Sequence, residues 1–242
     1  MHTKFDQRMK RYEQVSQTYL VRRCPVIIRL DGKAFHTFTK GFEKPFDKIM
    51  QHCMWYTAGK LMENVQGCVL VYTQSDEISL LLVDYKSVNS EAWFDYRVDK
   101  LCSIVASMAT LYFNSEFAKE LVFLEDNNPD IEVYRNAWEN GALFDARAFN
   151  IPKEDVNNYF VWRQADCKRN SIQGIAQYYF NRNDIKGKNN AAILRMLSES
   201  GIEWEDYSES ERFGVSKAET GETHIHFMEN PNIVNKLVFI NE

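Results

Sequence analysis

The alternation of apolar and polar positions along the chain predicts a mixture of strands and helices. Four short apolar runs are typical of strands: residues 25–30, 69–72, 78–83 and 142–149. Five longer segments are predicted helices: residues 4–19, 46–65, 92–118, 155–180 and 188–199. A polar, acidic stretch begins at Gly201. His224 and His226 alternate in a further predicted strand, and a short apolar run at 233–240 closes the chain.

The order of these elements favours an α+β fold. Through residue 149 it runs strand, helix, strand, strand, helix, strand. This is the split β-α-β arrangement of ferredoxin-like domains and of the polymerase palm, an antiparallel sheet flanked by helices. We expect residues 1–152 to form a palm-like catalytic core. Residues 153–242 are the predicted C-terminal extension, mostly helical and packed on that core.

The expected strand order brings two distant acidic residues together. A right-handed crossover makes the first two strands parallel, and the third strand lies between them. Asp31 ends the first strand, and Asp76 lies in the polar turn after the second. Both residues are therefore expected at the same edge of the sheet.

This pair of carboxylates predicts a metal site. Two acidic groups side by side repel each other and lose hydration when they are buried, and a bound cation offsets this unfavourable energy. Magnesium takes oxygen ligands and substrate phosphates, and two such ions can promote an in-line displacement at phosphorus. Gly32 lets its backbone carbonyl approach a metal closely, Glu77 completes the acidic turn, and Ser75 offers a hydroxyl to a phosphate or a base. The plainer alternative is an ordinary Asp-Gly turn and an ordinary hairpin turn.

Candidate phosphate ligands follow the same segments. Lys33 and His36 come just after the first aspartate, and Lys44 lies in a Gly-Phe-Glu-Lys-Pro segment. Arg97 and Lys100 are three positions apart on a predicted helix, so they project from one face. If that face meets the metal edge, the two side chains would hold a triphosphate. The alternative is a solvated charged face.

Composition and charge narrow the class of protein. The net charge is −5, so the whole surface does not attract nucleic acid, and an RNA partner needs a local basic face. One candidate face, which could equally be a solvated helix and loop, consists of Lys168, Arg169, Arg182, Lys186 and Lys188. The five scattered cysteines lack a CxxC pair and are interpreted as reduced core residues. A charged start and the lack of a long apolar run indicate a cytoplasmic protein without a membrane partner.

Four motifs carry a resemblance to a known family: Arg29-Leu-Asp-Gly-Lys-Ala-Phe-His36, Gly41-Phe-Glu-Lys-Pro45, Tyr72-Thr-Gln-Ser-Asp-Glu77 and Trp162-Arg-Gln-Ala-Asp-Cys167. In this order they resemble the tRNA-histidine guanylyltransferase family. The resemblance implies a palm enzyme that adds nucleotides in the 3′–5′ direction to the 5′ end of tRNA. It implies activation of a 5′-monophosphate by ATP, then attack by the 3′-hydroxyl of GTP or another nucleoside triphosphate. It also implies a homotetramer.

The resemblance carries residue roles as well. It implies that Asp31, the Gly32 carbonyl and Asp76 bind two magnesium ions, with Glu77 as a further catalytic acid. Nucleotide contacts are implied for Asp31, Gly32, Lys33, Ala34, Phe35, His36, Lys44, Ser75, Asp76, Arg97 and Lys100. Arg147, Arg163 and Asp166 are less specific additions to this set.

One segment departs from the family pattern. Eukaryotic members follow the cysteine of the last motif with His-Ile-Asn-Asn, whereas Lys168-Arg-Asn-Ser171 stands here. The chain is more similar to bacterial, archaeal and phage-type members, so we expect template-dependent repair of truncated tRNA, with guanylate addition to tRNA-histidine as the close alternative. A nucleotidyl cyclase shares the palm sheet and the paired aspartates, and acts on free GTP or ATP. A non-catalytic tRNA-binding module would tolerate loss of either aspartate.

Overall fold

The structure is a computed structural model of the 242-residue chain, and it describes residues 3–124, 131–219 and 223–224. The strands are β1 (Val26–Gly32), β2 (Cys68–Gln74), β3 (Glu77–Leu82), β4 (Phe144–Asn150), β5 (Val215–Ala218) and β6 (Thr223–His224). The α-helices are α1 (Lys4–Gln14), α2 (Phe35–Phe38), α3 (Lys48–Asn64), α4 (Val98–Phe123), α5 (Ile131–Asn140), α6 (Lys153–Tyr179), α7 (Arg182–Ile185), α8 (Asn190–Glu199) and α9 (Glu209–Phe213). Short 3-10 helices cover Trp93–Tyr96 and Trp204–Asp206. Among these described residues, no helix is both long and apolar enough to cross a membrane.

The strands form one antiparallel sheet in the order β4-β1-β3-β2-β5-β6. Because β3 pairs antiparallel with both β1 and β2, the latter two run parallel with β3 between them. The first four strands therefore have the predicted ferredoxin-like order. This topology places the end of β1 and the turn between β2 and β3 at one edge of the sheet.

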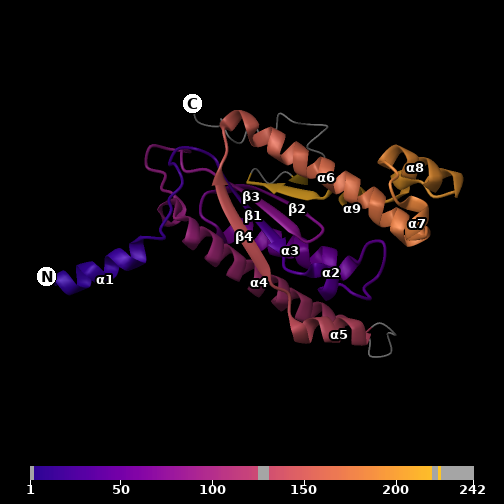
Figure 1. Cartoon of the computed structure of the whole chain (residues 1–242), viewed down its shortest axis with the longest axis horizontal. Coiled ribbons are helices and arrows are strands. Elements are labelled where there is room, and N and C mark those ends of the chain that lie inside the picture. The colour runs from indigo at the N-terminus through magenta and orange to yellow at the C-terminus, as the bar shows by residue number, and fades with distance from the viewer. Residues whose placement is uncertain (1–2, 125–130, 220–222, 225–242) are drawn as a thin grey trace.

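Helices cover both faces of the sheet (Figure 1). On one face, α3 and α4 bury a core that includes Ile28, Leu30, Leu61 and Phe113. On the other face, α6 packs Phe160 and its apolar neighbours against the sheet. Full burial of one such side chain contributes about 1.5–3 kcal/mol. The two packed layers therefore hold the sheet, and its acidic edge, in place.

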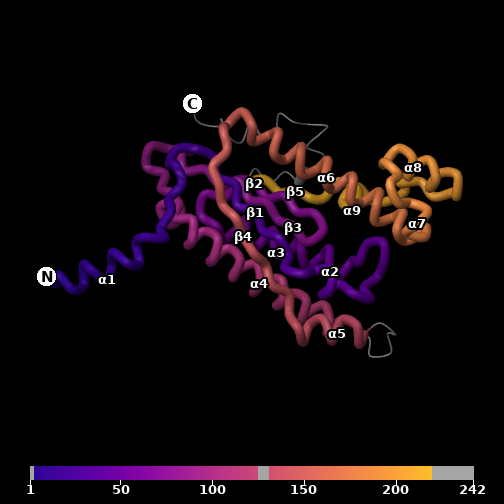
Figure 2. Tube along the Cα trace, in the orientation of Figure 1, coloured from indigo at the N-terminus to yellow at the C-terminus, as the bar shows by residue number. Residues whose placement is uncertain are grey.

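The C-terminal segment differs in part from the predicted helical extension. After α6, the helices α7 to α9 enclose a third apolar cluster around Trp204 and Ile193. The chain then returns to the sheet, and β5 pairs with β2. In Figure 2 the trace of α6 runs across the sheet, and α7 and α8 lie beyond its end. The predicted extension is thus mostly helical, but it also supplies sheet strands.

Other differences concern element ends. The first helix stops at Gln14, although helix was predicted to residue 19, and it has no buried residue. Helix α5 was not predicted, because its ten residues follow an Asn-Asn-Pro segment that reads as a loop. Strand β5 is only four residues long and lies in a polar stretch, so periodicity is uninformative there. His226 and the apolar run at 233–240 lie outside the described residues.

Candidate active site

The two predicted acidic segments converge at the edge of the sheet. Asp31 near the end of β1 is paired across the ladder with Glu77 at the start of β3. The backbone N–H of Gly32 donates to the carbonyl of Asp76 at 3.0 Å. Asp76 itself follows β2 in the tight turn, where Ser75 has a φ of 48° and donates its hydroxyl to the Asp76 carboxylate at 3.1 Å. Strand order thus brings the carboxylates of distant segments to one place.

Arginines neutralise part of this charge. Arg29 Nη2 lies 2.9 Å from Asp31 Oδ1 and 3.0 Å from Glu77 Oε2. From the neighbouring strand β4, Arg147 Nη2 reaches Asp31 Oδ2 at 2.7 Å. Asp31 therefore has a cation on each of its two oxygens. A metal ion bound by Asp31 would replace one of these contacts and leave an arginine available for phosphate.

Helix α6 contributes a third arginine. The Arg163 side chain is 4% exposed, and its Nε lies 2.9 Å from Glu77 Oε1. The same guanidinium donates to Asp166 one turn later at 2.5 Å. Removing one partner of such a buried pair leaves an uncompensated charge, which typically costs about 3–5 kcal/mol. The ion pair thus ties the C-terminal helix to the acidic edge.

The electrostatics at this edge favour a cation. Burial raises the pKa of Asp76, and the negative charge of Asp31 raises it further. Burial also raises the pKa of Glu77 to about 7, against the opposing effects of Arg163 and Arg29. Ionised carboxylates that are partly buried beside one another are stabilised by a divalent cation with oxygen preference. The donor set of Asp31, Asp76 and a Gly32 carbonyl fits magnesium on this ground.

The loop after β1 is fixed by an aromatic anchor. A Cβ on Gly32 would meet the Phe35 ring at 2.2 Å, so glycine is required for the ring to reach its position. Ala34 has a φ of 55°, which turns the chain into α2. Phe35 then packs against Phe38 and Phe113, with ring centroids 5.1 and 5.6 Å apart respectively. The loop beside the acidic edge therefore rests on the core between α3 and α4.

A cavity of about 530 Å³ opens beside the acidic edge. Its size is in the range of small-molecule and cofactor sites. Residues of the predicted nucleotide set that line it are Gly32, Ala34, Phe35, His36, Lys44, Ser75 and Asp76. Apolar side chains, among them Met54 and Trp55 of α3, form another part of the wall. The cavity thus combines a carboxylate edge, an exposed lysine and an apolar wall.

Two predicted phosphate ligands lie elsewhere. The backbone of Arg97 bridges to Tyr19 just before β1, at the edge of the sheet opposite to Asp31. Its Nε lies 2.8 Å from an Asp99 carboxylate oxygen, and Lys100 is exposed on the first turn of α4. The N-cap and first turn of α4, which carry these residues, do not meet the acidic edge within one chain. The two side chains were expected to hold a triphosphate if their helix face met the acidic edge, and within one chain it does not. Phosphate binding by these two residues stays a prediction.

Several site residues were missed by the sequence analysis. Arg29 is a charged residue inside an otherwise apolar strand, and this was the available signal. Gln74 is 6% exposed, and its side-chain amide donates to the Arg163 carbonyl at 3.3 Å. From the C-terminal segment, Asn170 and Glu211 line the cavity. No local pattern marks these two as cavity residues, because Asn170 lies on α6 and Glu211 on α9 and only the packing of these helices brings them there.

The palm-type sheet, its acidic edge and the adjoining cavity together define a nucleotidyltransferase of the palm class. The sequence profile of the family described as tRNAHis guanylyltransferase matches residues 6–152. The chain belongs to this family, whose members are nucleotidyltransferases. A probable tRNA(His) guanylyltransferase of Mus musculus is 34% identical over 157 residues, which cover 62% of this chain and 45% of the mouse protein. The match thus spans less than half the length of that relative.

Two solved structures match nearly the whole chain. A bacterial tRNA(His) guanylyltransferase (Thg1)-like protein in complex with ATP has a TM-score of 0.86 and 34% identity, and the match covers 97% of this chain and 99% of that one. A bacterial Thg1-like protein in complex with GTP has a TM-score of 0.76 and 32% identity, with 98% of this chain and 100% of that chain covered. The similarity therefore extends through the C-terminal segment that the family profile leaves out.

Proposed function

We propose that this protein is a magnesium-dependent enzyme that adds nucleotides in the 3′–5′ direction to the 5′ end of tRNA. The acidic edge beside a nucleotide-sized cavity is the observation that carries the proposal. Family membership supports the tRNA substrate, and the ATP and GTP held by the similar bacterial structures support nucleoside triphosphates as co-substrates. We further propose that the protein acts in the cytoplasm, as its charged start indicates, and that it is a homotetramer, as the resemblance implies.

Each group at the site has a role in this chemistry. Asp31 and Asp76 would hold magnesium with the Gly32 carbonyl, and the metal, when bound, lowers the pKa of the attacking hydroxyl and neutralises the leaving group. Lys44, exposed at the cavity, would contact a phosphate of the nucleotide. Arg29 and Arg163 keep Glu77 in place from two sides. The apolar wall would orient the base, so that the 3′-hydroxyl of the incoming nucleotide faces the 5′ phosphate of the RNA.

Template-dependent repair is the preferred form of this activity. The segment that departs from the eukaryotic pattern, residues 168–171, contributes Asn170 and Ser171 to the cavity wall. A changed wall beside the nucleotide is a physical reason for a changed choice of substrate. We therefore propose that the base opposite the truncated end selects the nucleotide, in preference to guanylate addition that is restricted to tRNA-histidine.

The proposal is tested with purified protein, magnesium, each labelled nucleoside triphosphate, and tRNAs that are intact or lack their 5′ nucleotide. We expect the 5′ end to grow only with the nucleotide that complements the opposing base. Cyclic nucleotide formed from GTP or ATP without tRNA would instead support the cyclase alternative.

Asp76→Ala separates catalysis from binding. The substitution removes a metal ligand but no proposed RNA contact, so we expect 5′ addition to fall by at least about 10³-fold while tRNA affinity stays within about twofold. Gel-shift and single-turnover assays measure the two quantities on the same preparation. Retained turnover in this variant would refute the metal assignment.

A further inference from the structure

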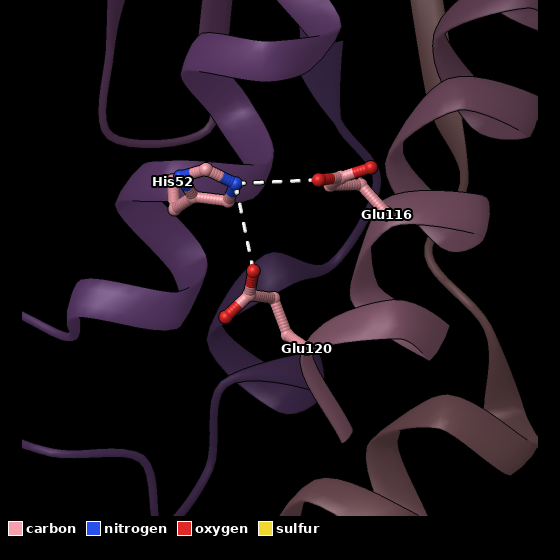
Figure 3. A group of neighbouring side chains, drawn as sticks. All are labelled: His52, Glu116 and Glu120. Atoms are coloured by element: carbon pink, nitrogen blue, oxygen red, sulfur yellow. Dashed lines mark hydrogen bonds and ion pairs between the residues drawn. The ribbon is translucent and has the colours of Figure 1, made fainter. Parts of the chain in front are cut away.

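A second group of metal-binding side chains lies between α3 and α4, apart from the acidic edge. His52 projects from α3, and Glu116 and Glu120 project from successive turns of α4 (Figure 3). His52 Nε2 lies 3.3 Å from Glu116 Oε1 and 3.5 Å from Glu120 Oε1. All three donor atoms lie within 4.8 Å of one another. One ring nitrogen thus faces two carboxylate oxygens.

Both contacts are within ion-pair distance, but they are long for a charge-assisted hydrogen bond. Charge-assisted N–H···O contacts are about 2.7–2.9 Å long, and a single N–H can point at only one oxygen. Both measured distances are longer than that. Ligand bonds of about 2.0–2.1 Å around a tetrahedral zinc ion place neighbouring ligand atoms about 3.4 Å apart. The 3.3 and 3.5 Å separations agree with two edges of such a tetrahedron.

Lys119 holds the buried carboxylate in the orientation that a metal needs. Its ammonium donates to Glu116 Oε2 at 2.7 Å, which leaves Oε1 turned toward His52. The same ammonium lies 4.9 Å from the centroid of the Tyr56 ring, which fixes it further. Outer-shell partners of this kind orient metal ligands in known sites.

The helices that carry the cluster are rigidly packed. Glu116 is 8% exposed, and the adjacent Phe117 is fully buried in the core. The ring of His52 is half exposed, with 52% of its side chain accessible, so water can complete the coordination. One imidazole nitrogen with two carboxylate oxygens is a donor set that suits zinc, whereas magnesium prefers an octahedral all-oxygen shell.

We propose that His52, Glu116 and Glu120 form a binding site for one divalent cation of the zinc type, with water as the fourth ligand. The site is separate from the acidic edge and does not depend on the proposed reaction. It joins α3 to α4, and Gln51 and Trp55, which flank His52 on α3, line the cavity beside the acidic edge. The bound ion would therefore hold α3, which forms part of the cavity wall, against α4.

Zinc titration of the full-length protein tests the proposal. After removal of metals by EDTA, the protein is titrated with zinc in buffer that contains excess magnesium, and bound zinc and the unfolding temperature are measured. We expect one tight equivalent and a rise in the unfolding temperature. His52→Gln and Glu120→Gln should each weaken zinc binding at least about tenfold and reduce the thermal shift. The second variant provides the test if the first fails to fold.

Glu63→Gln is the matched control, because it removes an exposed carboxylate from α3 outside the cluster and should bind zinc as the unchanged protein does. Cobalt substitution adds a spectroscopic readout. A strong visible band of tetrahedral cobalt without a thiolate charge-transfer band is expected. Equal zinc affinity of His52→Gln and the unchanged protein, or a thiolate band that assigns the ion to cysteine, would overturn the proposal.

Discussion

Gly32 shows how one missing side chain can position a loop at the acidic edge. The Phe35 ring occupies the space that a Cβ on residue 32 would need, and it connects the loop to the core. The Asp-Gly pair suggested a tight turn, but the close approach of the ring could not be anticipated. The sequence therefore indicated a turn at Gly32, but it did not indicate the ring contact that requires glycine there.

Gly32→Ala is expected to displace the ring and with it the loop. Overpacking of this kind costs about 1–3 kcal/mol, and we expect 5′ addition to be lost in larger proportion than stability. Gly59→Ala is the control, since nothing lies within 4 Å of its added Cβ and alanine favours helix α3 by up to about 1 kcal/mol. Denaturant unfolding and turnover measure both effects. Unchanged stability and activity of Gly32→Ala would show that the ring moves freely.

Glu77 predicts a particular pH dependence. Its pKa of about 7 in the folded protein exceeds the ordinary value of 4.5, chiefly because it is buried. Between these values the folded state binds a proton that the unfolded state lacks. The contribution of Glu77 to stability therefore falls as pH rises from about 4.5 to 7, by up to about 3 kcal/mol in total.

Glu77→Gln removes this titration. In denaturant unfolding with EDTA present, we expect the stability of the variant, relative to that of the unchanged protein, to be higher at pH 7.5 than at pH 5. Parallel pH profiles of the two proteins would contradict the raised pKa.

At the scale of elements, strand order was predictable, whereas the short late elements were not. Apolar periodicity predicted β1 to β4 and the long helices α3 and α4 between them, and the first four strands have the expected order. β5 and α5 are short and lie in polar or loop-like sequence, so tertiary packing decides their conformation. Arg97 and Lys100 were predicted on one helix, but Arg97 is the extended N-cap residue of α4 and only Lys100 is helical; both lie at the edge opposite to Asp31.

The end of α6 leads into a region that is a candidate RNA contact. Arg182, Lys186 and Lys188 are exposed there, with Asp184 between them. Lys168 of the same predicted face instead lies over the Trp204 ring at 5.1 Å. Arg169 is exposed on α6 but is paired with Asp166. The remaining exposed cations of the predicted face lie on and just after α7.

Lys186→Glu combined with Lys188→Glu is expected to weaken tRNA binding about tenfold or more, because two phosphate contacts become repulsive. The dependence of affinity on salt should also become shallower. Lys4→Glu with Lys10→Glu makes the same change of net charge on α1 and serves as the control. Equal losses of tRNA affinity in the two double variants would indicate a general charge effect and no specific contact.

At the scale of the whole molecule, the site depends on segments from the entire described chain. The end of β1, the turn after β2, the face of α3 and the C-terminal segment all meet at one cavity. The acidic part was predictable, because strand order alone brings Asp31 and Asp76 to one edge. The arginines and the C-terminal wall were not, because their positions follow from packing across elements.

The most direct test counts metal ions at the acidic edge. Bound manganese is measured by electron paramagnetic resonance with a non-hydrolysable GTP analogue, in a His52→Gln background that excludes the site between α3 and α4. We expect two ions per chain, and a loss of at least one when Asp31→Asn or Asp76→Asn is added. Both variants keeping two ions would contradict the assignment of these carboxylates as the metal site.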